Sequence, residues 1–400
     1  MEMAESASGV ALHFTRDEYL QRLRKTKERM AARGIEVLVV CEPTNIFYLA
    51  GYDAWSFYVP QALLVALEDE EPIWIGRFMD AAAARQTAFI GAERIIGYSD
   101  DHVQSAEKHP MHVVAELMTS RGWGSRAVGL ELDAYYFSAR AHNELTSHLP
   151  DANFVDASQL VNWVRVVKSD AEIAYIREAA RIVEGVVDAA YRTMEPGVRQ
   201  SDVAAAIYHA QIGGTAEYGG AYTSSPPFIP TGRNTSAPHL VWTDARYATG
   251  DITTLELVGA RHRYHCPSGR TIFLGEPSQE ISDTAAAVVE GLNAALDTIR
   301  PGATCEEVER AWRESVARHG IEKESRLGYS FGIAYPPTWG EQTLSLRPGD
   351  RTVLEPNMTL HVIPGVWLDD WGIVITEAIR VTATGHETFC NVPRELFVKA

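Results

Sequence analysis

The sequence predicts two domains, an α/β domain over residues 1–160 and an α+β domain over residues 161–400. The chain has 400 residues, of which 46% are hydrophobic, and this is enough for two separate cores. Short apolar runs alternate with helical stretches in the first part of the chain. In the second part, strand-like runs come before and after a pair of helices.

The N-terminal domain is predicted to open with a helix. Thr15 and Glu18 have the spacing of a capping box, and the helix should run to about Arg33, where Gly34 can take the left-handed stop position. The runs expected to be strands are 35–41, 62–67, 73–76 and 127–132, and the expected helices between and after them are 80–88, 112–120 and 138–148. This alternation indicates an α/β unit around a largely buried sheet.

A second capping box, Ser169 with Glu172, marks the start of the C-terminal domain. It should head a long helix that reaches about Met194 before Pro196-Gly197. Further helices are expected at 200–212, 281–299 and 305–319, strands at 253–258, 271–274, 359–363, 372–377 and 378–382, and loops at 213–238 and 328–332. We expect the helices to cover one face of an antiparallel sheet.

The overall charge excludes some partners. Lys and Arg number 36 against 53 Asp and Glu, a formal charge of −17, so nucleic acid and anionic membranes would be repelled. The four cysteines are scattered, which fits reduced thiols. The first residues have no basic segment followed by an apolar one, and no apolar stretch approaches eighteen residues, so we expect a cytoplasmic protein.

Three polar residues stand out as candidates for acid or base chemistry. Glu256 lies between two leucines and Glu377 follows an apolar run, so each could present a carboxylate from a rigid sheet. His239 follows Pro238 at the end of a loop rich in Gly and Pro, and its ordinary pKa lies near neutrality. Taken singly, each also fits an ordinary surface or structural position.

The segment from Gly328 to Trp339 combines small and aromatic residues, which is typical of a binding wall or of a packed turn. No HExxH motif or EF-hand pattern is present, and His262 and His265 have the wrong period for ligands on one face of a strand. The sequence also lacks a P-loop, a GxGxxG fingerprint and a GxSxG elbow. We therefore expect no bound metal and no cofactor.

Several motifs in order give the chain its family resemblance. They are the segment 163–173 with the letters WVRVVKSDAEI, the segment 250–256 with GDITTLE, Arg270-Thr271, the segment 328–332 with GYSFG, the segment 354–358 with LEPNM, and the late Glu377. In this order they resemble the creatinase, prolidase and aminopeptidase P superfamily over essentially the whole chain. The resemblance implies a creatinase-like N-terminal domain and a C-terminal pita-bread catalytic domain.

Peptidases of that superfamily hold two divalent ions with Asp, Asp, His, Glu and Glu. In this sequence the five positions fall on Glu256, Pro267, Tyr329, Ile363 and Glu377. Two carboxylates are too few for a closed dinuclear site, because hard divalent ions need several oxygen ligands each. The resemblance therefore implies a hydrolase without a catalytic metal.

Creatinase, a metal-free hydrolase of the superfamily, is similar in having two Glu and a loop His, which match Glu256, Glu377 and His239 here. A cationic planar substrate can be gripped by carboxylates without a Lewis acid. Val59 stands where creatinase has an Arg, and the run from Tyr329 to Trp339 looks like the ectoine-degrading branch. This implies hydrolysis of the cyclic amidine ectoine to N-acetyl-2,4-diaminobutyrate, with Tyr329 orienting the substrate.

In the superfamily, the stretch that contains Trp55, Phe57 and Tyr58 closes the pocket of the partner subunit. The resemblance therefore implies a homodimer in which these aromatic residues bind substrate, although they also fit a core or an interface. A creatinase-type amidinohydrolase, a dimethylsulfoniopropionate lyase and a non-catalytic binding module stay open as alternatives. Arg263, Arg270 and Arg326 are unranked candidates for holding the substrate carboxylate.

Overall fold

The computed structural model describes residues 3–400, which form two compact units that meet between Arg165 and Val166. The sequence had placed this boundary between residues 160 and 161. Helix α6 (Leu160–Arg165) accounts for the difference, because it packs against α1 (Arg16–Ala32) and α2 (Pro43–Ala50) of the first unit. Within residues 3–400, no helix combines the length and apolar character needed to cross a bilayer.

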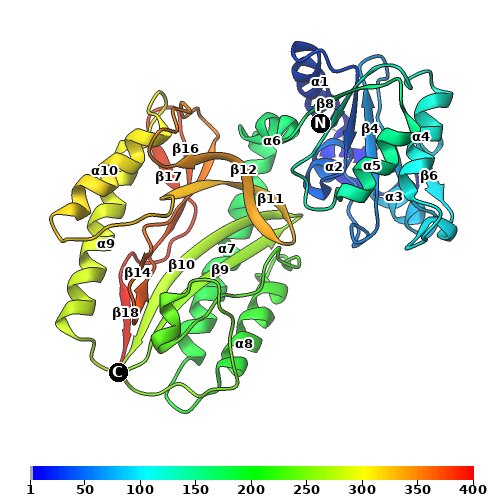
Figure 1. Ribbon diagram of the computed structural model, residues 1–400. Helices are drawn as coiled ribbons and strands as arrows, with labels where there is room; N and C mark the ends of the chain where they lie inside the picture. The colour runs from blue at the N-terminus through cyan, green and yellow to red at the C-terminus, as the bar shows by residue number, and fades with distance from the viewer. Residues whose placement is uncertain (1–2) are drawn as a thin grey trace. The chain divides into compact units, whose positions relative to one another are not determined.

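A mixed sheet of six strands forms the centre of the first unit, in the order β6-β5-β4-β3-β7-β8 (Figure 1). The strands are β3 (Val37–Val40), β4 (Ala62–Ala66), β5 (Ile73–Arg77), β6 (Ile95–Tyr98), β7 (Ala127–Leu130) and β8 (Asn153–Asp156). The helices are α1 (Arg16–Ala32), α2 (Pro43–Ala50), α3 (Ala81–Thr87), α4 (Pro110–Ser120) and α5 (Ala139–His148). Alternate residues of the inner strands pack on α4 and α5, as expected for a buried α/β sheet. A hairpin of β1 (Met3–Glu5) and β2 (Ala11–Thr15) precedes α1.

Both predicted helix starts are confirmed. The Thr15 side chain accepts a hydrogen bond of 3.2 Å from the backbone N–H of Glu18, and Gly34 has a φ of +66° just after α1. At the start of α7 (Asp170–Thr193), Ser169 and Glu172 form both halves of a capping box. Local hydrogen-bonding chemistry therefore fixes where these two helices begin.

The sheet of the second unit runs β17-β16-β13-β11-β10-β18, with β9 added on β10 and β12 on β11. Its strands are β9 (Ile252–Arg261), β10 (Tyr264–Leu274), β11 (Gly328–Tyr335), β12 (Thr338–Leu346), β13 (Thr359–Val362), β16 (Glu377–Val381), β17 (His386–Thr388) and β18 (Leu396–Lys399), and a separate pair is β14 (Val366–Trp367) with β15 (Gly372–Ile373). The two predicted strands 253–258 and 271–274 are parts of one long β9-β10 hairpin. Its two-residue turn, His262-Arg263, has positive φ at both residues, as in a type I′ turn.

The prediction of a loop at 328–332 is wrong, because these residues begin strand β11, which pairs with both β12 and β13. Glycine and serine suggested a turn, but here they permit close packing inside the sheet. A Cβ atom added at Gly328 would collide with the backbone oxygen of His361 on the neighbouring strand. Small residues in a strand can therefore mark a close backbone approach rather than a turn.

The second unit also contains long helices. They are α7, α8 (Gln200–Gly213), α9 (Gln279–Thr298) and α10 (Cys305–Ala317). Helix α7 lies along β9 and β10, and α9 packs beside α10 (Figure 1). Gly259 of β9 permits the close contact with α7, since a Cβ atom there would meet the backbone oxygen of Ala179. The helix and the hairpin are thus held at backbone contact distance.

A buried ion pair joins the start of the second unit to its sheet. Lys168 Nζ lies 2.6 Å from Glu341 Oε2, and both side chains are 1% exposed. Nearby, the Tyr264 hydroxyl donates to Glu172 at 2.9 Å, so the capping residue of α7 also contacts β10. The motif that contains Lys168 therefore anchors the chain where it enters the second unit.

Replacing Lys168 by Met should lower the free energy of unfolding by about 3–5 kcal/mol, because it leaves the Glu341 carboxylate buried without its partner. Urea denaturation followed by near-UV circular dichroism measures this change. The double variant Lys168→Met, Glu341→Leu is the control and should recover most of the loss. Equal destabilisation in the single and double variants would show that the pair is not the cause.

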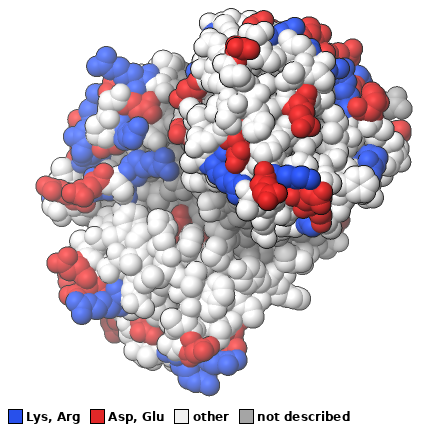
Figure 2. Space-filling model, turned by 45° about the vertical axis from the view of Figure 1, so that its right-hand side comes forward, with Lys and Arg blue, Asp and Glu red and all other residues white. Residues whose placement is uncertain are grey.

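Charged side chains are spread over the surface. Figure 2 shows acidic and basic residues interspersed on the visible face, and several pairs such as Arg77 with Asp100 lie within 2.7 Å of each other. On this face the acidic residues do not gather in one patch.

Candidate functional site

Glu256 lies on β9, where its backbone is held from both sides. It pairs with Gly269 of β10, and it exchanges two backbone hydrogen bonds, of 2.9 and 3.2 Å, with Phe228 of the preceding irregular segment. The side chain keeps partial exposure, but the burial of its carboxyl group raises the pKa to about 7. Glu256 is therefore a rigidly mounted acid that changes its charge near neutral pH.

Lys323 is the charged neighbour of Glu256. Its Nζ donates a hydrogen bond of 2.8 Å to the Gly365 carbonyl and lies 4.2 Å from the centroid of the Trp367 ring. Burial lowers the pKa of Lys323 to about 7, while the charge of Glu256 acts in the opposite direction. Sequence reasoning missed this residue, because a single Lys in the irregular segment between α10 and β11 carries no pattern.

Glu377 begins β16 and is almost fully buried. Its Oε1 accepts from Arg270 Nη2 at 3.0 Å and from Arg394 Nε at 3.1 Å. Burial raises the pKa of Glu377, although both guanidinium groups lower it. Glu377 lies on a strand of the sheet, as predicted, but its carboxylate is already paired with two cations.

Tyr329 and Trp339 lie on the neighbouring strands β11 and β12. Trp339 Nε1 donates to the Tyr329 hydroxyl at 3.0 Å, and the Trp339 ring centroid lies 6.5 Å from that of Phe228, which pairs with Glu256. Burial, followed by the charge of Glu256, raises the pKa of Tyr329 above its ordinary value. The hydroxyl therefore stays protonated beside the carboxylate and can act as a donor.

A buried histidine, His361, joins these residues to Glu377. Its ring lies 5.9 Å from Tyr329, and Nε2 lies 2.8 Å from Thr376 Oγ1, which also accepts from the Gly269 N–H. Burial lowers the pKa of His361 to about 3, so the ring is neutral. Sequence reasoning missed His361, because a lone His inside an apolar strand looks structural.

His239 is exposed, and its ring lies 5.4 Å from that of Phe228 between centroids. Phe228 in turn pairs with the backbone of Glu256. This geometry suits a proton carrier open to solvent better than a residue in direct contact with Glu256.

The structure ranks the three candidate arginines. Arg270 is fully engaged with Glu377 and with backbone carbonyls such as that of Pro393, at 2.7 Å. Arg263 is buried and lies 3.6 Å from the ring centroid of Tyr222. Arg326 is exposed and its guanidinium lies 4.2 Å from the ring centroid of Tyr329. Arg326 is therefore the candidate best placed to bind an anionic group.

The three aromatic residues predicted to bind substrate differ in exposure. Trp55 and Tyr58 are each 58% exposed, whereas Phe57 is only 5% exposed. The Phe57 ring packs against Trp55 and Tyr136, with centroids 4.8 and 5.0 Å away. Phe57 is thus buried beside Trp55, and its role in binding substrate stays a prediction.

The family positions for metal ligands offer few donors. Pro267 lies within β10, opposite Val258, and Ile363 follows β13 with an apolar side chain. Glu377 carries two guanidinium partners, which would repel a divalent ion at the same place. The donor set around Glu256 therefore does not fit two hard divalent ions.

Comparison with known proteins agrees with this architecture. Residues 22–167 match the creatinase/prolidase N-terminal domain, and residues 174–383 match metallopeptidase family M24. The chain is 44% identical to the ectoine hydrolase of Halomonas elongata, covering 98% of this chain and 99% of that protein. It is 50% identical to an uncharacterized hydrolase/peptidase of Sinorhizobium fredii, over 97% of this chain and 99% of that one.

Solved structures show the same fold at lower identity. The prolidase from Thermococcus sibiricus superposes with a TM-score of 0.83 at 19% identity, and the Xaa-Pro dipeptidase from Bacillus anthracis with 0.79 at 22%. Each match covers 95% of this chain and 99% of the other. They place the second unit in the pita-bread fold, as predicted.

These findings define a hydrolase that acts on C–N bonds. The chain belongs to metallopeptidase family M24, in the branch that carries a creatinase/prolidase N-terminal domain. The predicted fold class and superfamily are thereby confirmed.

Replacing Lys323 by Met should raise the pKa of Glu256 further above 7, because the ammonium charge of Lys323 lowers it in the native protein. Infrared difference spectroscopy of the carboxyl band over a pH series measures this shift, with Glu256→Gln used to assign the band. Lys323→Arg keeps the positive charge and should leave the Glu256 pKa nearer its original value. An unchanged pKa in Lys323→Met would show that the two groups are not coupled.

Proposed function

We propose that this protein hydrolyses the cyclic amidine ectoine to N-acetyl-2,4-diaminobutyrate without a catalytic metal. One observation carries the proposal: an enclosed carboxylate, Glu256, lies where the family holds metal ions, while Pro267, Tyr329 and Ile363 supply no carboxylate or imidazole. The 44% identity to the Halomonas elongata ectoine hydrolase over nearly the whole chain supports the choice of substrate.

The charge of the substrate takes the place of the missing ions. An amidinium carries a delocalised positive charge and N–H groups that a carboxylate can bind through charge-assisted hydrogen bonds. Glu377 is already compensated by Arg270 and Arg394, so Glu256 is the carboxylate that meets the cation. Glu377 then acts by fixing Arg270 and the end of β16 rather than by gripping the ring.

Glu256 acts on the ring carbon between the two nitrogens. Glu256 either takes a proton from a water that attacks this carbon, or attacks it directly and forms a covalent intermediate that a water then hydrolyses, which frees the carboxylate. On both routes the C–N bond of the ring breaks as the departing nitrogen gains a proton. A carboxyl pKa of about 7 suits a group that accepts and returns a proton near neutrality. Tyr329 donates a hydrogen bond to the substrate, and His239 exchanges the proton with solvent.

The proposal includes a homodimer in the cytoplasm. Trp55 and Tyr58, the exposed aromatic residues of the first unit, would cover the substrate bound in the partner subunit through cation–π contact. Phe57 would hold the Trp55 ring in place from its buried position.

Glu256→Gln should reduce the turnover of ectoine at least 1000-fold while weakening binding much less, because the amide keeps the shape but cannot accept the proton. Turnover is followed by proton NMR, and binding by calorimetry. Wild-type protein treated with a chelator is the matched control and should keep its full rate. Near-normal turnover in Glu256→Gln, or a rate lost with the chelator and restored by divalent ions, would refute the proposed mechanism.

Arg326→Gln should raise the KM for ectoine about 10- to 100-fold with little change in kcat, since a charged hydrogen bond to the substrate carboxylate is worth about 1.5–3 kcal/mol. Steady-state kinetics on ectoine measures both constants. Arg326→Lys keeps the positive charge but loses the paired N–H donors of the guanidinium, so its KM should lie between those of the wild type and of Arg326→Gln. An unchanged KM in Arg326→Gln would show that another residue binds the substrate carboxylate.

A further inference from the structure

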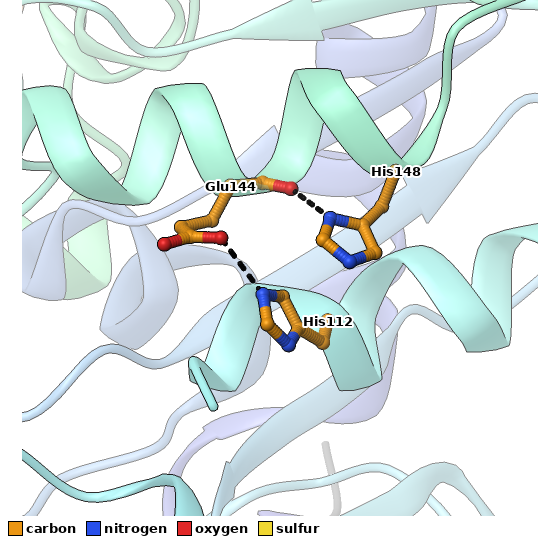
Figure 3. A group of neighbouring side chains, drawn as sticks. All are labelled: His112, Glu144 and His148. Atoms are coloured by element: carbon orange, nitrogen blue, oxygen red, sulfur yellow. Dashed lines mark hydrogen bonds and ion pairs between the residues drawn. The ribbon is translucent and has the colours of Figure 1, made fainter. Parts of the chain in front are cut away.

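A second cluster of metal-binding side chains lies in the first unit, on the helix pair α4 and α5. Figure 3 shows His112 of α4 facing Glu144 and His148 of α5. One ligand atom from each of the three residues lies within 4.8 Å of the other two. The sequence expectation of no metal gave no weight to these residues, although Glu144 and His148 are four apart and share one face of α5.

Hydrogen bonds already orient the three side chains. His112 Nε2 lies 2.8 Å from Glu144 Oε2, and His148 Nδ1 lies 2.7 Å from the backbone oxygen of Glu144. The carbonyl thus holds one nitrogen of His148 and leaves Nε2 as the ligand atom. Imidazoles that bind metals are commonly oriented in this way by a carbonyl partner of the second ring nitrogen.

We propose that His112, Glu144 and His148 form a site for one divalent transition-metal ion of the zinc class, with water completing the coordination. Two imidazoles and a carboxylate match the ligands that Zn²⁺ and Ni²⁺ prefer, whereas Ca²⁺ and Mg²⁺ need more oxygen ligands. The ion replaces the proton between His112 Nε2 and Glu144 Oε2. That proton moves to His112 Nδ1, which then gives up the 3.4 Å hydrogen bond that it accepts from the His109 backbone N–H.

The site needs only a small rearrangement to close. In a tetrahedral zinc site with bonds of about 2.0 Å, ligand atoms lie about 3.3 Å apart. The His112 and Glu144 atoms are already nearer than this, so His148 makes most of the movement. The two imidazole rings stack with centroids 4.1 Å apart. The exposed His148 ring must tilt so that Nε2 approaches the ion while Nδ1 keeps its hydrogen bond to the Glu144 carbonyl.

Bound metal would cross-link α4 and α5 without taking part in turnover. The ion would tie the last turn of α5 to the first turn of α4, over the core that both helices share. An ion at this site would also affect tests of whether turnover needs a metal. Metal analysis of the whole protein would detect an ion even though the residues around Glu256 hold none.

The test titrates the full-length protein with ZnCl₂ in calorimetry, and hydrogen exchange then locates the ion. We expect one ion per chain and slower exchange in residues 110–120 and 139–148. His148→Gln and His112→Gln should each weaken binding at least 10-fold. His142→Gln, a neighbouring histidine of α5 outside the cluster, is the matched control and should bind normally.

Two outcomes would overturn the proposal. One is the absence of zinc binding at concentrations up to about 100 μM, a range in which sites with three protein ligands should be filled. The other is binding that survives His148→Gln but is lost in Glu256→Gln, which would assign the ion to the second unit. Ectoine turnover, measured on the same samples, should be unchanged in the His112 and His148 variants, so this test is separate from that of the proposed function.

Discussion

The arrangement of the candidate site depends on one constraint, the placement of a carboxylate inside a hydrogen-bonded sheet. Glu256 cannot move away from its neighbours, because both edges of its backbone are paired, with Gly269 on one side and Phe228 on the other. A carboxylate held in this way is costly to ionise unless a positive charge lies near it. Lys323 supplies such a charge within the protein, and a cationic substrate would supply another.

The two glutamates of the candidate site, Glu256 and Glu377, therefore have different surroundings. Glu377 is satisfied by Arg270 and Arg394 and forms part of the frame of the sheet. Glu256 has the charge of Lys323 nearby and keeps partial exposure. The chemistry follows from this difference, because a paired carboxylate holds its charge while an enclosed one can exchange a proton near neutral pH.

Much of the fold could be predicted, because local chemistry sets it. The caps at Thr15 and Ser169 gave the helix starts, and the apolar runs gave most of the strands. The prediction of a loop at 328–332 was wrong, because Gly328 permits close packing against a neighbouring strand. That requirement depends on the neighbouring strand and cannot be seen in the segment itself. In the site, Glu256 and Glu377 could be predicted from their apolar strand neighbours, and the role of Tyr329 from the family resemblance. Lys323 and His361 required the fold, since each is a single residue whose partners lie far along the chain.

The backbone contact between α7 and β9 limits how this protein can vary. Gly259 lies three positions after Glu256 on the same strand and touches Ala179 of the long helix, so even a methyl group there would push the hairpin and its carboxylate out of place. Changes of substrate preference would then have to arise at side chains around Glu256 that do not pack against this helix. Evolution of new activities on this scaffold would thus be uneven, because the contact with α7 restricts β9 more than it restricts other strands.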